Sequence, residues 1–203
     1  MKRNLVFGVL TCVLAAVMAV SMDGRQAGPG GNGNGTADGS ESSKIQIGYR
    51  IAPVPLDLNG KNPALVGLGS YVVNAQADCA GCHSNPQYAP GGDPHFGQPE
   101  LSEPSGHLRG GLQLFGPLVV PRNLTPNSAG LPAGLTLAQF LEVLSIGTDF
   151  DNAPPVVPGP HSADLLQVMP WPVFSKMTDR EKRAIYEYLR AIPCLPAGSN
   201  RCT

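Results

Sequence analysis

Two cysteines and a histidine stand at a spacing that can bond a porphyrin to the chain. Cys79, Cys82 and His83 form the pattern C-x-x-C-H in the run Cys-Ala-Gly-Cys-His. Thiols separated by one tight turn can add to the two vinyl groups on one side of the ring, while the next residue places an imidazole beneath the iron. The spacing therefore predicts one covalently attached haem c, held by Cys79 and Cys82 and ligated at iron by His83.

The same cysteine spacing has two other uses. A thioredoxin-like redox pair belongs at a helix N-terminus in a βαβ unit, whereas here a helical pattern leads into the motif and Pro/Gly-rich loops leave it. A tetrahedral zinc site needs a second closely spaced ligand pair, and Cys194 and Cys202 are too widely spaced to supply one. Zinc held with the help of His83, His95 and His107 remains a minor alternative.

The sixth iron ligand is predicted to be a methionine. Met169 lies in the proline-bounded run 168–172, which we expect to be stiff and extended and to hold a thioether over the iron. Met177 stands at the start of the last predicted helix, where a methionine more often fills the core. We therefore favour Met169 over Met177. Three histidines in Pro/Gly-rich loops are less favoured and are expected to be solvated or hydrogen-bonded: His95, His107 and His161.

The sixth ligand decides what the site does. Two strong-field side chains leave no position for oxygen or peroxide, so a His/Met site predicts electron transfer without catalysis. A thioether also favours ferrous iron and raises the reduction potential, which suits an electron acceptor. If Met169 only filled the core, an open-site peroxidase or a haem-based sensor would be the alternative. A peroxidase needs a distal His or Arg, for which Arg109 and Arg122 are candidates.

Helical patterns flank the motif on both sides. Asn62 and Pro63 predict the start of a helix that runs to Cys79. Its apolar residues recur at helical spacing: Leu65, Leu68, Val72 and Ala75. Two later helices each begin with a capping box, formed by Thr136 with Gln139 and by Thr178 with Glu181. Gly147 and Pro193 are predicted to end these two helices.

Between His83 and Leu135 the chain is rich in proline and paired glycine. No regular element of ordinary length fits most of it, and so long a loop is expected only where it wraps something that supplies core. A haem is such an object. The fold class predicted is mostly α: a small cytochrome c-type helical domain around a covalent haem, with long Pro/Gly-rich loops.

The N-terminus predicts export. Lys2 and Arg3 precede an apolar run over residues 5–20 that ends in small residues, as in a secretory signal peptide over residues 1–21. An uncleaved anchor is the alternative, and Cys12 leaves a lipid attachment as a minor one. We therefore expect a periplasmic protein, with membrane tethering if the leader is retained.

The next segment lacks large apolar side chains. Residues 22–43 are rich in Gly, Ser and Asn and are predicted to form a flexible linker. The cytochrome domain is expected over residues 44–203. At its start, apolar side chains alternate and can cover one edge of a core: Ile45, Ile47, Tyr49 and Ile51.

Composition limits the partners. The chain has 203 residues, with 14 Lys and Arg against 15 Asp and Glu, so no basic field would attract nucleic acid. Redox proteins are the expected partners.

The sequence resembles mono-haem cytochromes c of the His/Met type, above all single haem modules of the cytochrome subunits of periplasmic alcohol and sugar-acid dehydrogenases. The shared stretches are residues 69–71, 77–83, 122–126, 139–140, 169–171 and 177–193, which cover most of residues 63–193. Those subunits usually carry three haem motifs, whereas this chain has a single C-x-x-C-H. The resemblance implies electron transfer from a dehydrogenase or respiratory donor to an oxidase or another cytochrome.

The resemblance also assigns roles to single residues. In that family the Met before Pro is the distal iron ligand, which here is Met169. The first and last helices cross near the haem, and this implies a close backbone approach at Gly69, with Tyr71 and Tyr188 packed around the crossing. Outside the resemblance, Cys194 and Cys202 are predicted to close the C-terminal tail with a disulfide, although coupling of two chains is the alternative.

Overall fold

The structure is a computed structural model that describes residues 39–114, 116–151, 164–197 and 202. All of them belong to one compact unit, Thr36–Thr203. The predicted leader and most of the predicted linker lie outside the described residues. In the described part the chain is mostly helical, and the pairing between extended segments is confined to isolated bridges. The prediction of a mostly α domain is therefore confirmed.

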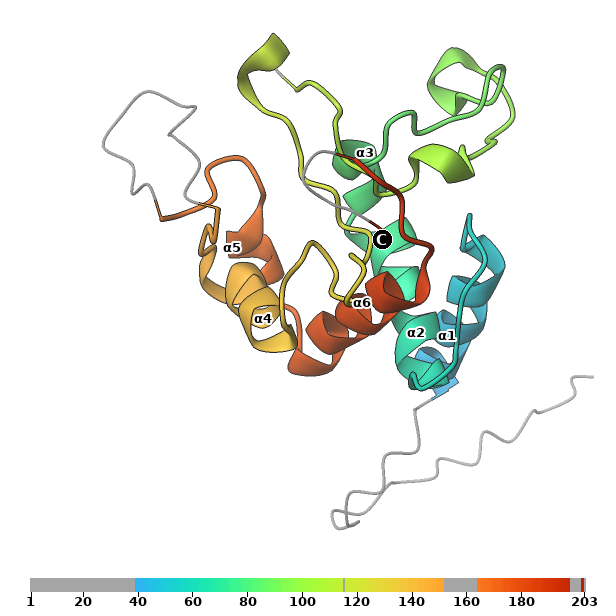
Figure 1. Cartoon of the computed structure of the whole chain (residues 1–203). Coiled ribbons are helices and arrows are strands. Elements are labelled where there is room, and N and C mark those ends of the chain that lie inside the picture. Colours follow the sequence, from blue (N-terminus) through green and yellow to red (C-terminus); the bar gives the residue numbers. More distant parts are fainter. Residues whose placement is uncertain (1–38, 115, 152–163, 198–201, 203) are drawn as a thin grey trace, which may run out of the picture. The chain divides into compact units, whose positions relative to one another are not determined.

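The principal helices come from three regions of the chain (Figure 1). They are α1 (Gly39–Ile51), α2 (Pro63–Tyr71), α3 (Cys79–His83), α4 (Leu137–Ile146), α5 (Trp171–Phe174) and α6 (Asp179–Ala191). Within the segment 84–135 the helical elements of the described residues are short 3-10 turns: η2 (Pro94–Phe96), η3 (Pro104–Gly106) and η4 (Gly116–Leu118). Among the described helices, none has both the length and the apolar character needed to cross a bilayer.

Helix α1 corrects the prediction for the start of the domain. It begins at Gly39, inside the predicted linker 22–43, and its apolar residues do not alternate between two faces. Contacts with the rest of the domain hold it: Gly48 is so close to α2 that an added Cβ would lie 1.9 Å from the Gly67 carbonyl oxygen. Glu41 also forms an ion pair with Arg180 of α6, at 2.6 Å. The alternating pattern was misleading because tertiary contacts outweigh local periodicity here.

Helix α2 begins as predicted. The Asn62 side chain accepts hydrogen bonds from the backbone N–H groups of Ala64 and Leu65, and Pro63 occupies the first turn. After Tyr71 the chain continues through the wider π-helical turn η1 (Val72–Gln76). This turn leads through Ala77 and Asp78 to Cys79, as the spacing of apolar residues indicated.

Helices α2 and α6 lie against each other (Figure 1), and their backbones approach closely at Gly69. A Cβ at residue 69 would lie 1.9 Å from the Ala184 carbonyl oxygen and 2.8 Å from the Tyr188 Cβ, so only glycine permits this approach. The expectation for Gly69 and Tyr188 is therefore confirmed. Tyr71 differs, because its ring lies beneath Lys44 Nζ of α1, 5.8 Å from the ring centroid.

Both capping boxes predicted from the sequence are present. Thr136 caps α4 together with Gln139, and Thr178 caps α6 together with Glu181. Gly147 ends α4 with a φ of 78°, the left-handed conformation that favours glycine. Helix α6 ends at Ala191, shortly before Pro193. These two helices carry much of the core that lies behind the site described next.

Candidate functional site

A cavity of about 480 Å³ opens beside the C-x-x-C-H motif. Cys79, Cys82 and His83 line it, and so do both Met169 and Met177. Most of the remaining wall is apolar and comes from η1, α4, α6 and the loop before α4. It includes Val73, Leu124, Phe140, Leu144, Ile185 and Leu189. Tertiary structure thus brings the predicted attachment residues and both candidate methionines to one largely apolar cavity of ligand-binding size.

The motif itself forms the short helix α3. Asp78 precedes it with a φ of 46°, and its side chain accepts a hydrogen bond from the Gly81 N–H at 3.1 Å. A Cβ at residue 81 would lie 2.6 Å from a carboxylate oxygen of Asp78, so glycine allows this tight turn. Cys79 and Cys82 are both free thiols in the structure. Burial raises the pKa of the Cys79 thiol to about 12, whereas thiol-redox cysteines need a lowered pKa.

His83 is oriented by a backbone carbonyl from a distant part of the chain. Its Nδ1 lies 2.8 Å from the Arg122 carbonyl oxygen. Because a carbonyl only accepts, Nδ1 carries the proton and Nε2 is left with its lone pair. Burial lowers the pKa of His83, which favours the neutral imidazole that metal ligation requires.

The Arg122 side chain anchors the same segment to the region after α4. Its guanidinium forms ion pairs with the buried Asp149 and, at 2.6 Å, with the exposed Asp151. With its carbonyl beside His83 and its guanidinium in two ion pairs, Arg122 does not match the distal group of a peroxidase. Arg109, the other candidate, donates from Nε to the Pro196 carbonyl oxygen at 3.2 Å and does not line the cavity. Sequence analysis did not identify Asp149, because this residue belongs to no recognisable sequence motif.

The segment around Met169 is not the extended run that was predicted. It bends at residues 167–169, and α5 begins directly after Pro170. Trp171 holds the bend from both ends: its Nε1 donates to the Leu166 carbonyl at 3.0 Å, and its backbone N–H donates to the Met169 carbonyl at 2.8 Å. The Trp171 ring in turn packs against Gly147, where a Cβ would lie 2.3 Å from it. Met169 is therefore presented to the cavity by a bent, anchored loop.

Met177 lies between α5 and α6 and reaches the same cavity. Both methionines are partly buried and pack against the core. The structure therefore brings the favoured and the less favoured candidate together, and the choice between them remains a prediction.

The other histidines differ in their surroundings. His95 lies in η2 with its ring edge-on to Tyr88, at 6.3 Å between centroids. His107 is buried and its Nε2 lies 2.9 Å from the Tyr188 hydroxyl, which fits the expectation of a hydrogen-bonded side chain. Neither lines the cavity, and His161 lies outside the described residues. In the part of the chain that the structure describes, no three His, Cys, Asp or Glu side chains are grouped to hold a metal ion, so the zinc alternative has no ligand set there.

His107 belongs to a buried polar network. Asn74 donates from Nδ2 to the Tyr188 hydroxyl oxygen at 3.2 Å and to Ser70 Oγ at 3.2 Å, and Ser70 Oγ donates to the Gly48 carbonyl at 2.7 Å. Burial raises the pKa of Tyr188, so its hydroxyl stays protonated in this network. The network joins α1, α2, α6 and the loop after α3.

Acidification should destabilise the fold through His107. Burial lowers its pKa from 6.5 to about 4, so between these values the unfolded chain binds more protons and the free energy of unfolding falls as the pH falls. The loss amounts to roughly 3 kcal/mol when complete, at 1.36 kcal/mol for each pKa unit. Urea unfolding from pH 7 to pH 4 measures it in the parent and in His107→Gln, which keeps a polar partner for Tyr188. An equal pH dependence in both proteins would contradict the assignment.

Comparison with known proteins gives a distant and partial similarity. The chain is 28% identical over 126 residues to the fructose dehydrogenase cytochrome subunit of Gluconobacter japonicus. The match covers 61% of this chain, and the chain spans about a fifth (20%) of the length of that relative. No protein-family model and no solved structure matches the chain. The similarity supports a relationship to cytochromes.

Proposed function

We propose that this protein transfers electrons through one haem c that is bonded to Cys79 and Cys82 and ligated at iron by His83 and Met169. The observation that carries the proposal is the position of His83. Its Nδ1–H is held by the Arg122 carbonyl at 2.8 Å, and its ring belongs to the wall of an apolar cavity that both methionines also line.

The cavity fits the group chemically. Two free thiols stand at its edge, one neutral imidazole lines it with its Nε2 uncommitted, and its walls are mainly apolar. A thioether and an imidazole are a known pair of axial ligands in electron-transfer cytochromes. These are the groups that a covalent, low-spin haem requires.

A haem bound here supplies a reversible ferric–ferrous couple. Cys79 and Cys82 tether the ring, and the Arg122 carbonyl fixes the tautomer and the orientation of the His83 imidazole. Trp171 holds the loop that carries Met169, while Phe140, Leu144 and their neighbours provide an apolar wall for the ring. If His83 and Met169 both remain bound to iron, little rearrangement would accompany a change of oxidation state.

We further propose that the protein acts as an electron carrier or as an electron-transfer subunit. The donor would be a dehydrogenase or a respiratory protein, and the acceptor an oxidase or another cytochrome. The similarity to a dehydrogenase cytochrome subunit supports this class of partner. The N-terminal sequence supports export to the periplasm, with a membrane tether if the leader remains. An open-site enzyme or sensor is the second candidate, and it requires that neither Met169 nor Met177 ligates iron.

Covalent attachment is tested by producing the exported protein together with a cytochrome c maturation system. We expect the parent to retain one haem per chain after denaturation, as measured by the pyridine haemochrome spectrum, and Cys79→Ser/Cys82→Ser to retain none. Cys194→Ser/Cys202→Ser removes the same number of sulfur atoms elsewhere and should retain the haem. A parent without covalent haem would contradict the proposal.

Electron transfer itself is tested by anaerobic mixing with a sugar or alcohol dehydrogenase that has been reduced by its substrate. Rapid appearance of the ferrous spectrum supports the role as an acceptor. Rapid binding of carbon monoxide to the ferrous protein would instead favour the open-site candidate.

A further inference from the structure

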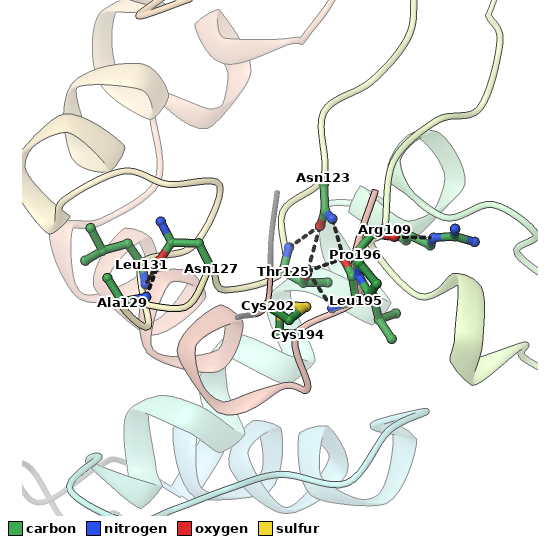
Figure 2. The surroundings of a disulfide bond; sticks show 10 residues. All are labelled: Arg109, Asn123, Thr125, Asn127, Ala129, Leu131, Cys194, Leu195, Pro196 and Cys202. Atoms are coloured by element: carbon green, nitrogen blue, oxygen red, sulfur yellow. Dashed lines mark hydrogen bonds between the residues drawn. A yellow bond between two sulfur atoms is a disulfide. The ribbon is translucent and has the colours of Figure 1, made fainter. Parts of the chain in front are cut away.

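The C-terminal tail is bonded to the segment that orients His83. After α6 the chain reaches Cys194, which forms a disulfide with Cys202. We use the name tail for the described residues 194–197 and 202, and the name acceptor segment for residues 122–125. Figure 2 shows the described tail residues Leu195 and Pro196 next to Asn123 and Thr125 of the acceptor segment.

Two hydrogen bonds and one longer polar contact join the two segments. Asn123 donates from Nδ2 to the Leu195 carbonyl at 2.6 Å, and the Leu195 N–H donates to Thr125 Oγ1 at 3.1 Å. Thr125 Oγ1 also lies 3.3 Å from the Leu195 carbonyl oxygen. Leu195 thus engages the acceptor segment through both of its backbone polar groups. On the other side, Arg109 donates to the Pro196 carbonyl at 3.2 Å.

The acceptor segment is also tied internally. Asn123 Oδ1 accepts from the Thr125 backbone N–H at 2.8 Å and from Thr125 Oγ1 at 2.7 Å. The Asn123 side chain therefore holds Thr125 with its oxygen and the tail with its nitrogen (Figure 2). Thr125 has no exposed surface, so water does not replace these bonds readily.

The residue directly before Asn123 is Arg122, whose carbonyl accepts the Nδ1–H of His83 at 2.8 Å. We propose that the disulfide-closed tail, acting through Asn123 and Thr125, positions this carbonyl against His83 and so sets the electron donation of the imidazole. The inference rests on the proposed ligation of iron by His83. Asn123, Thr125 and Leu195 are positioning residues, because they act through Arg122 and not on the iron.

The physical basis is the steep distance dependence of a hydrogen bond. An acceptor at 2.8 Å withdraws the Nδ1 proton and makes Nε2 a stronger donor, and an increase of several tenths of an ångström removes most of this effect. A stronger donor stabilises ferric iron, so loosening the carbonyl should raise the reduction potential. A chain end that lacks its disulfide frays more readily, and the acceptor segment would then lose its contacts with Leu195.

The test compares four full-length proteins: the parent, Cys194→Ser/Cys202→Ser, Asn123→Ala and the control Asn127→Ala. Asn127 has the same residue type and lies in the same loop, and its Oδ1 accepts from the backbone N–H groups of Ala129 and Leu131, which belong to its own loop (Figure 2). Urea unfolding measures stability in each protein. Redox titration measures the potential, and proton exchange at the His83 ring Nδ1–H, followed by NMR with labelled histidine, measures the hydrogen bond.

We expect the Nδ1–H of His83 to exchange at least tenfold faster in the cysteine pair variant and in Asn123→Ala than in the parent and Asn127→Ala. The reduction potential should rise in the same two variants by about 28 mV. This corresponds to a roughly threefold change in the ferric-to-ferrous ratio, at 59 mV for each tenfold change. If the tail only stabilised the fold, the two variants would be less stable than the parent, but the exchange of the His83 Nδ1–H and the reduction potential would not change. That result would overturn the inference.

The two proposals fail in different ways. Exchange of the His83 Nδ1–H is measured in the purified protein whether or not it carries haem. Absence of haem in the parent therefore contradicts the proposed function, while faster exchange in the two tail variants still supports the positioning role. If the cysteine pair variant does not fold, Asn123→Ala decides the outcome, because it keeps the disulfide and removes only the side-chain link.

Discussion

Replacing Met169 by Leu should abolish the weak red absorption band that marks a sulfur-to-ferric-iron bond and should convert the ferric haem to a high-spin form. Leu keeps nearly the same volume and apolar character, so the cavity is expected to stay packed while the thioether is lost. The potential should also fall, since a neutral soft ligand favours ferrous iron. The visible spectra of the oxidised and reduced protein measure the first effect, and redox titration measures the second.

The matched control is Met177→Leu. Met177 lines the same cavity and is also partly buried, so the two variants differ chiefly in which sulfur is removed. We expect Met177→Leu to keep the red band. If Met177→Leu loses the band and Met169→Leu keeps it, the ligand assignment is reversed, and if both variants keep it, neither methionine ligates iron.

Adding one methyl group at Gly69 should destabilise the domain by about 3 kcal/mol or more, the upper end for overpacking in a core. A Cβ there would lie 1.9 Å from the Ala184 carbonyl oxygen, which is a backbone atom and cannot rotate away. Helices α2 and α6 would have to separate, and both carry side chains that line the cavity wall or pack behind it. Urea unfolding followed by far-UV circular dichroism measures the loss in Gly69→Ala.

Gly60→Ala serves as the control for that substitution. Gly60 has a φ of +65° and nothing within 4 Å of an added Cβ, so the cost there is only backbone strain, about 1 kcal/mol. A loss at Gly69 no larger than the loss at Gly60 would show that α2 and α6 do not need the close approach.

The sequence alone determined the elements whose signals are local. The cap at Asn62 and the boxes at Thr136 and Thr178 each place a polar side chain within three residues of the N–H groups that it satisfies, and α2, α4 and α6 begin where these signals predicted. The disulfide between Cys194 and Cys202 was also expected and is present, since it joins residues only 8 apart in the sequence.

The sequence was less informative where structure depends on distant contacts. The alternating residues before Pro53 belong to helix α1, which is held by Gly67 and Arg180 from other helices. The run after Met169 begins the helix α5 because Trp171 folds back on Leu166 and packs on Gly147. In both places a local pattern predicted an extended or unstructured segment, and tertiary packing decided otherwise.

In the candidate site, too, some features follow from the local sequence and others depend on tertiary contacts. The spacing of Cys79, Cys82 and His83 is itself the chemical requirement, because three adjacent points must meet one ring, and it can therefore be read from five consecutive residues. The group that orients His83 is a backbone carbonyl 39 residues away. Every residue has such a carbonyl, so no residue type marks Arg122 for this role, and only the folded chain, with Asn123 and Thr125 bonded to the tail, brings it to the imidazole.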